Sequence, residues 1–129
     1  MSDKMEAISV LKGKVVHGKA LGRTVGMPTA NLLIIEGSLP DAGVYATRIR
    51  VGEESFLSVT NIGTRPTVDD DAYVTVEVHI LDFERDIYGE TVILEILRFL
   101  RPIQRFQNLQ EVQAQVSKDI ACARSLEKK

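Results

Sequence analysis

Apolar and polar residues alternate one by one through residues 72–83, AYVTVEVHILDF. One set of alternating positions holds Val74, Val76, Val78 and Ile80, and the other holds Thr75, Glu77 and His79. A period of two is typical of a β-strand with one face on a core. We therefore predict a strand here, with Glu77 and His79 on the face that is free for chemistry.

Other segments share this patterning. They are residues 7–18, 43–52, 55–63 and 91–100. The GEE turn that follows residues 43–52 predicts a hairpin with 55–63, and the YGE turn at 88–90 favours pairing of 91–100 back onto 72–83. Five or six short strands with close turns indicate an antiparallel barrel.

The last segment, from residue 108, changes to a helical period. Its apolar residues recur at three- and four-residue spacing: Leu109, Val112, Val116, Ile120 and Ala123. Asn108 followed by Glu111 forms a candidate capping box at the start. We predict a C-terminal amphipathic helix, with Cys122 as a small packed side chain on or beside its apolar face.

Length and composition predict one ordinary globular domain over residues 1–129. The net charge of −2, from 16 basic and 18 acidic residues, leaves no basic stripe of the kind that binds nucleic acid. A single cysteine excludes an intrachain disulfide and a cysteine-based zinc cluster. Neither a signal peptide nor a bilayer-length apolar run is present. We expect a cytoplasmic monomer with no membrane or nucleic-acid partner.

A glycine-rich stretch, HGKALGRTVGMPTAN, spans residues 17–31, with Gly18, Gly22 and Gly26 at every fourth position. This spacing matches neither a Walker loop nor a dinucleotide-binding loop. Its backbone is compatible with a flap that closes on phosphate oxygens, with Arg23 as a charged clamp. Turn glycines of a surface loop remain the alternative.

Thr29 and Asn31 follow Pro28 and lie two apart in a segment expected to be extended, so their side chains point the same way. A hydroxyl and an amide carbonyl are hard oxygen ligands that suit Mg²⁺. Caps of a turn are the alternative reading of both residues.

Five blocks in order carry a resemblance to a known family: GRTVGMPTANL, LPDAGVYA, NIGTRPTV, VEVHILDFERDIYGE and LRPIQRFQNLQEVQAQVSKDI. Over residues 11–124 the chain resembles the riboflavin kinase (ATP:riboflavin 5′-phosphotransferase) family. The resemblance implies a six-stranded antiparallel barrel with a C-terminal helix. It also implies Mg²⁺-dependent transfer of phosphate from ATP to riboflavin, giving FMN. Such a domain occurs alone or joined to an FMN adenylyltransferase domain.

The resemblance also implies roles for individual residues. Glu77 takes the place of the catalytic base, and Thr29 and Asn31 take the places of Mg²⁺ and nucleotide ligands. Arg101 resembles an arginine on the flavin side of the site. The remaining candidates for nucleotide binding are Gly18, Gly22, Arg23, Gly26, His79 and Tyr88.

Two other classes of protein compete with the kinase. A flavin-binding module would keep an apolar cleft but would not need the flap with Thr29 and Asn31. An interaction barrel for nucleic acid or protein would need basic and aromatic residues on one sheet face, whereas this chain has no Trp and 5% aromatic residues. The kinase reading is the best supported of the three.

Overall fold

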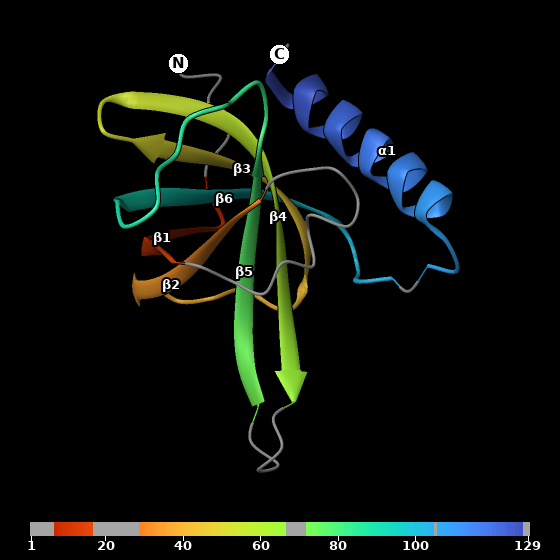
Figure 1. The fold of residues 1–129 in the computed structure, drawn as a ribbon, viewed down its shortest axis with the longest axis horizontal. Helices are drawn as coiled ribbons and strands as arrows, with labels where there is room; N and C mark the ends of the chain where they lie inside the picture. The colour runs from red at the N-terminus through yellow and green to blue at the C-terminus, as the bar shows by residue number, and fades with distance from the viewer. Residues whose placement is uncertain (1–6, 17–28, 67–71, 105, 128–129) are drawn as a thin grey trace.

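The computed structural model describes residues 7–16, 29–66, 72–104 and 106–127, which form six strands and one helix (Figure 1). The elements are β1 (Ser9–Val16), β2 (Ala30–Glu36), β3 (Gly43–Val51), β4 (Glu54–Pro66), β5 (Ala72–Ile80), β6 (Thr91–Arg101) and α1 (Leu109–Glu127). The predicted mainly-β fold with a C-terminal helix is confirmed.

The six strands form a closed barrel in the order β1-β2-β5-β4-β3-β6, and every neighbouring pair is antiparallel. The predicted hairpin is β3–β4. Its two-residue turn, Gly52 and Glu53, joins the paired residues Val51 and Glu54. β4 and β5 extend beyond the other strands at the lower end of the barrel in Figure 1. The ring closes through a short seam between β2 and β5, where Ala30 pairs with Val78 and Asn31 with Glu77.

One predicted pairing is wrong. β6 lies between β1 and β3, and β5 lies between β2 and β4, so residues 91–100 do not pair with 72–83. The turn at 88–90 joins β1 instead, because Gly89 N–H donates to Val15 O and Val15 N–H donates to Glu90 O, each at 2.9 Å. The alternation of residues predicts a strand but does not name its partner.

The barrel interior is filled mainly by apolar side chains, together with the buried hydroxyls of Thr47, Ser58 and Thr60. In β5, Val76, Val78 and Ile80 are buried and Glu77 and His79 face outward and are half-buried, as predicted, but the prediction for Val74 is wrong, since it is 47% exposed. β3 differs, because its residues 43–47 are buried on both faces. Its outward residues Val44 and Ala46 pack with Val59 and with Ala123 of α1.

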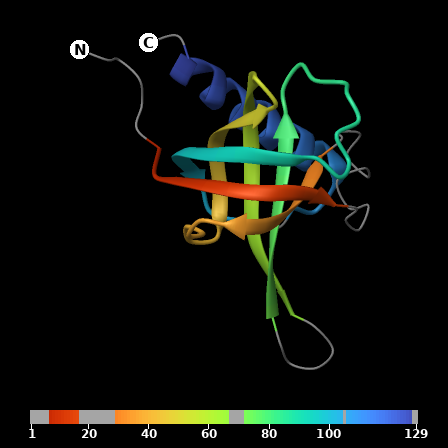
Figure 2. The ribbon, with the colours of Figure 1, turned by 90° about the vertical axis from the view of Figure 1, so that its left-hand side faces the viewer.

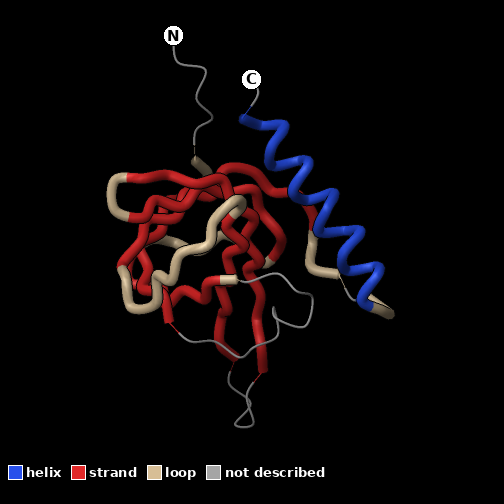
Figure 3. The backbone as a smooth tube through the Cα atoms, turned by 45° about the horizontal axis from the view of Figure 1, so that its top comes forward, coloured by secondary structure: helices blue, strands red, loops and turns tan. Residues whose placement is uncertain are grey.

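α1 lies along the outside of the barrel beside β3 and β4 (Figure 3). In Figure 2 β1 and β6 face the viewer and α1 lies behind the barrel. The helix starts with the predicted cap, since Asn108 Oδ1 accepts from Glu111 N–H at 2.9 Å. The carboxylate of Glu111 accepts from Gln107 N–H, one residue before the expected donor. The bond to Asn108 satisfies an N–H group that the first turn leaves without a helical partner, and the bond from Gln107 fixes the chain just before the cap.

The predicted packing of Cys122 is wrong, because its side chain is exposed. The face of α1 that packs on the barrel contains Asp119, Ala123 and partly buried Ile120 and Leu126. Cys122 directly precedes buried Ala123 and is itself exposed to solvent. The carboxylate of Asp119 is therefore buried near the middle of the helix, on the face where the sequence pattern predicts apolar side chains.

Candidate functional site

Three outward side chains lie in one row across neighbouring strands β2, β5 and β4. Asn31 pairs directly with Glu77, and Glu77 pairs directly with Asn61. Directly opposite residues in an antiparallel pair project from the same face with Cβ atoms about 4.5–5.5 Å apart. Glu77 therefore lies between two amide side chains.

A second row lies next to the first, one step toward α1. His79 pairs with Val59 of β4, and Thr29 directly precedes the pair formed by Ala30 and Val78. Continuing that register by one residue brings Thr29 level with His79. The candidates Thr29, Asn31, Glu77 and His79 thus share one small patch on the outside of the barrel.

The electrostatics of this patch follow from partial burial. Glu77 and His79 are half-buried. Burial lowers the pKa of His79 below its usual value, because the charged imidazolium loses hydration. The imidazole beside Glu77 is therefore neutral at neutral pH. Glu77 is the carboxylate that stands in line with Asn31 and Asn61.

The oxygen atoms suited to a magnesium ion are the Thr29 hydroxyl and the Asn31 carbonyl, on neighbouring outward positions of one extended segment. Such neutral oxygen donors fit Mg²⁺, which keeps several waters and takes further oxygens from phosphates. Among the described residues, no three His, Cys, Asp or Glu side chains gather into a metal site of another kind.

Tyr88 lies on the Asn31 side of the row. Its neighbour Gly89 bonds to Val15 near the end of β1, and Val16 of β1 pairs with Asn31. The Tyr88 ring is exposed, and its N–H donates to Asp86 Oδ1 at 3.0 Å. The residue is therefore one strand further from Glu77 than Asn31 is.

The four flap candidates, Gly18, Gly22, Arg23 and Gly26, lie outside the described residues. The described residues on either side of this segment are Val16 and Thr29, and both adjoin the Asn31 position. The described residues that flank this segment thus lie beside the patch that contains Asn31 and Glu77.

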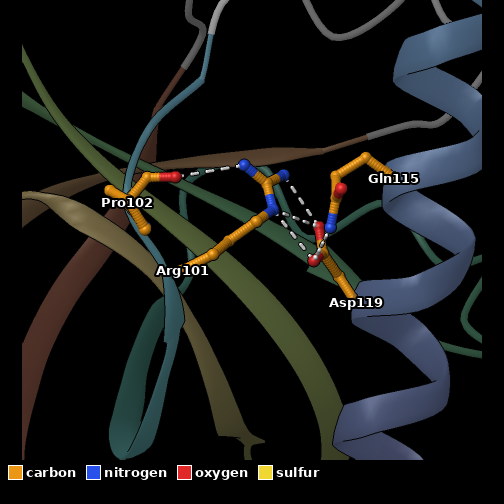
Figure 4. A network of polar contacts seen from close by, with 4 residues as sticks. All are labelled: Arg101, Pro102, Gln115 and Asp119. Atoms are coloured by element: carbon orange, nitrogen blue, oxygen red, sulfur yellow. Dashed lines mark hydrogen bonds and ion pairs between the residues drawn. The ribbon is translucent and has the colours of Figure 1, made fainter.

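Arg101 belongs to a different set of contacts, shown in Figure 4. Its Nε donates to both carboxylate oxygens of Asp119, at 3.0 and 3.2 Å, and its Nη2 donates to Oδ2 at 2.8 Å. Gln115 Nε2 donates to Asp119 Oδ1 at 3.1 Å. The Arg101 charge is therefore paired with a buried carboxylate of α1, and its assignment to the flavin stays a prediction.

Two further contacts fix the Arg101 guanidinium. Its Nη1 donates to Pro102 O at 3.3 Å, and the guanidinium carbon lies 5.8 Å from the centre of the Phe106 ring. Arg101 also pairs with Val44, which in turn pairs with Asn61. The same cross-strand row thus runs from Asn31 through Glu77 and Asn61 to the β6 arginine under α1.

Two residues of this region are absent from the sequence-based candidates. Asn61 occupies the outward position of β4 two residues after Val59. The alternation of residues in β4 predicts its outward direction, but only the pairing of β4 with β5 brings it opposite Glu77. Asp119 lies four residues after Gln115, inside the apolar spacing of the helix. A lone carboxylate on an apolar helical face was the available signal for it.

The helix in the described part of the chain lacks the apolar length needed to span a bilayer.

Residues 6–127 match the family Flavokinase, described as riboflavin kinase. The chain is 44% identical over 109 residues to the bifunctional riboflavin kinase/FMN adenylyltransferase of Listeria monocytogenes, covering 84% of this chain and 35% of that protein. It is 43% identical over 115 residues to the protein of the same name from Escherichia coli K12, covering 88% and 36%. The RNA-binding riboflavin kinase RibR of Bacillus subtilis is 41% identical over 115 residues, covering 89% and 50%. The chain thus spans about a third of the length of the bifunctional relatives.

Solved structures with a similar fold have different names. A macrolide-efflux protein from Streptococcus pneumoniae superposes with a TM-score of 0.83 at 34% identity, covering 89% of this chain and 38% of that one. Riboflavin kinase from Trypanosoma brucei superposes with a TM-score of 0.63 at 24% identity, covering 99% and 83%. The second likeness concerns the fold alone.

Proposed function

Because the chain belongs to the riboflavin kinase family, we propose that it transfers the γ-phosphoryl group of ATP to the 5′-hydroxyl of riboflavin. The products are FMN and ADP. The observation that carries the proposal is the position of Glu77, outward on β5 and directly opposite Asn31. A carboxylate and an oxygen ligand for the nucleotide metal are the two groups that such a transfer needs side by side.

In the proposed mechanism Glu77 orients the 5′-hydroxyl and accepts its proton as the new O–P bond forms. The transferred phosphoryl group requires in-line positioning and neutralisation of charge more than covalent help. The half-buried position of Glu77 supports this role, because partial exclusion of water strengthens the interaction between the carboxylate and the hydroxyl.

Thr29 and Asn31 are the residues proposed to hold Mg²⁺ and the nucleotide. Bound Mg²⁺ would neutralise charge on the phosphates and orient them. Thr29 and Asn31 would supply its protein oxygens from one extended segment, and His79 would be a neutral neighbour that contacts the nucleotide. Tyr88 lies on the nucleotide side of the row, which supports its proposed role. The proposed contacts of the flap residues Gly18, Gly22, Arg23 and Gly26 rest on the sequence resemblance.

The proposal also covers the surroundings of the reaction. We propose that residues 1–129 act as one catalytic domain in the cytoplasm, where ATP is available, as a monomer that needs no nucleic acid. The FMN product is a substrate for adenylylation, and two relatives carry FMN adenylyltransferase in their names. An adenylyltransferase, fused or separate, is therefore the proposed consumer of FMN.

The test is an assay of the purified protein with riboflavin, ATP and Mg²⁺, with the flavins separated by chromatography. We expect FMN to form, and we expect Glu77→Gln to lower kcat by about 100-fold or more, in the range for a general base. Glu36→Gln is the matched control, because Glu36 is an exposed strand glutamate at the other end of β2. FMN formation that is equal in all three proteins would remove Glu77 from the role of base. Binding of riboflavin without phosphorylation would show a carrier module instead.

A further inference from the structure

Asn61 lies beside the proposed base on the side away from the proposed nucleotide ligands. Its partner across the β4–β5 pair is Glu77, and the partner of Glu77 across the β2–β5 pair is Asn31. Asn61 is exposed, so its amide is accessible from outside the barrel. The order across the three strands is therefore nucleotide ligand, base, amide.

This order determines the side of Glu77 on which the rest of the acceptor, riboflavin, must lie. In phosphoryl transfer the attacking and leaving oxygens lie roughly in line on opposite sides of phosphorus. If the nucleotide is held on the Asn31 side of Glu77, the rest of the acceptor must extend to the other side. On that side the next strand is β4, and the directly opposite residue is Asn61.

The carbon chain that carries the 5′-hydroxyl of riboflavin also carries hydroxyls on the carbons next to it. Strands are spaced by about 4.8 Å, so a side chain on the neighbouring strand reaches these hydroxyls when the terminal one is at Glu77. The amide of asparagine both donates and accepts hydrogen bonds, which suits a chain of hydroxyls. Beyond Asn61 the row continues to Val44, which is buried beneath α1.

Gly63 supports the same path, because it places no side chain beside Asn61. It is the next outward residue of β4 and pairs with Thr75. Among the described residues, a Cβ added there would meet Thr75 Oγ1 alone, at an ordinary 3.5 Å, and no positive φ requires glycine. A strand glycine that packing does not require is typical of a position where a ligand approaches the backbone.

We propose that Asn61 binds the secondary hydroxyls of the ribityl chain and thereby selects riboflavin among flavins with other side chains. This inference rests on the phosphoryl transfer proposed above and assigns a substrate-binding role to a residue outside the sequence-based candidates. It predicts that Asn61 recognises the hydroxylated chain rather than ATP or the flavin ring.

The experiment compares two acceptors in the full chain. One is riboflavin, and the other is a flavin with a 5-hydroxypentyl chain, which keeps the reacting hydroxyl but lacks the secondary ones. We expect Asn61→Ala to lower kcat/KM for riboflavin by about 3–10-fold, the loss of one or two hydrogen bonds between uncharged groups. For the analogue we expect less than about a twofold change, since the partners are already absent. The KM for ATP should stay the same.

Ser55→Ala is the matched control, because Ser55 is another exposed outward polar residue of β4, far from Glu77 along the strand. Its two kcat/KM values should match those of the wild-type protein. The thermal midpoints of both variants should also match it, since both side chains are exposed. A structural role of Asn61 would lower kcat/KM for both acceptors together and would overturn the inference, as would an unchanged preference for riboflavin.

The inference and the proposed function fail in different ways. If the wild-type protein forms FMN and Asn61→Ala keeps the wild-type ratio of kcat/KM for the two acceptors, the kinase proposal stands and the role of Asn61 is wrong. If riboflavin binds without phosphorylation, the kinase proposal fails, and the ratio of Kd values for the two flavins in Asn61→Ala and wild-type protein decides the role of Asn61. If neither flavin binds, both proposals are wrong.

Discussion

Arg101 at the end of β6 is joined to Asp119 of α1 by an ion pair of 2.8 Å, in which the two side chains are 15% and 5% exposed. The carboxylate also accepts from Gln115, one helical turn away. The pair thereby ties the only helix in the described part of the chain to the strand on which its connection begins. Its partners come from residues 18 apart in sequence.

We predict that Asp119→Ala lowers the free energy of unfolding by about 3 kcal/mol, because it leaves the Arg101 charge largely buried without its partner. Urea unfolding followed by circular dichroism measures the effect. Glu54→Gln is the control, since the Glu54–Arg85 pair at 3.0 Å is exposed on both sides, and it should change stability by less than about 0.5 kcal/mol. Equal effects of the two substitutions would contradict a special role of the buried pair.

The proposed metal site gives a second prediction. Thr29→Ala should raise the Mg²⁺ concentration needed for half-maximal FMN formation, because one of two neighbouring protein oxygens is lost. Titration of Mg²⁺ at saturating ATP and riboflavin measures this. Thr91→Ala, which removes an exposed hydroxyl at the start of β6, should leave the requirement unchanged. The same Mg²⁺ requirement in both variants would show that Thr29 is not a ligand of the metal.

His79 makes stability depend on pH. Its pKa in the folded protein is lowered by burial, whereas the unfolded chain has the usual histidine value of about 6.5. As pH falls through this value, the unfolded chain gains a proton that the folded protein does not yet bind. The free energy of unfolding contributed by His79 is therefore fully present above about pH 6.5 and falls at lower pH.

The comparison of wild-type protein with His79→Gln isolates this dependence, since carboxylates and His17 are common to both chains. Urea unfolding at several values between pH 5 and 8 should show the stability difference shift in favour of the variant as pH falls. A difference that does not vary with pH would show that His79 does not titrate differently on unfolding.

Gly37, directly after β2, provides a prediction about the backbone. Its φ is +105°, and a Cβ there would collide with the backbone carbonyl of Val10 and lie 2.9 Å from Leu11 Cδ2. We expect Gly37→Ala to cost about 3 kcal/mol in stability, from strain at positive φ together with the clash. Gly52→Ala is the control, because Gly52 has φ +61° but no atom of the described residues lies within 4 Å of the added Cβ. It should cost about 1 kcal/mol. Similar costs for the two would mean that the contacts around Gly37 relax freely.

The strands and the helix could be predicted from the sequence because their signals are local. The alternation in residues 72–83 places Glu77 and His79 outward, and Asn108 with Glu111 places the start of the helix. The strand itself stops at Ile80, before Asp82 turns at a φ of 55°. Alternation continues through a turn of this kind, so it overestimates strand length.

The pairing of strands could not be predicted, and the site depends on it. Asn31 and Glu77 are 46 positions apart and meet only because β2 and β5 are neighbours in the closed barrel. The sequence resemblance supplied both residues as candidates, but it did not supply Asn61. Its importance follows from the register of β4 on β5, which no local pattern contains.

Buried polar groups were missed for a related reason. The hydroxyl of Thr47 lies 2.7 Å from that of Ser58 and 2.8 Å from that of Thr60, and all three residues are fully buried within the barrel. Sequence patterns treat such residues as exposed, because each is polar. In the fold they satisfy one another across two strands, and Asp119 is likewise buried only because Arg101 faces it.

The two faces of β5 have separate roles in the protein. Val76, Val78 and Ile80 pack in the barrel interior, while Glu77 and His79 between them lie on the outer face. Replacements at the outward positions therefore change the row of polar side chains with little effect on packing in the interior, and replacements at the inward ones adjust stability without removing a side chain from that row. Within the nine residues of β5, the stability of the barrel and the chemistry of its outer face can therefore evolve almost independently.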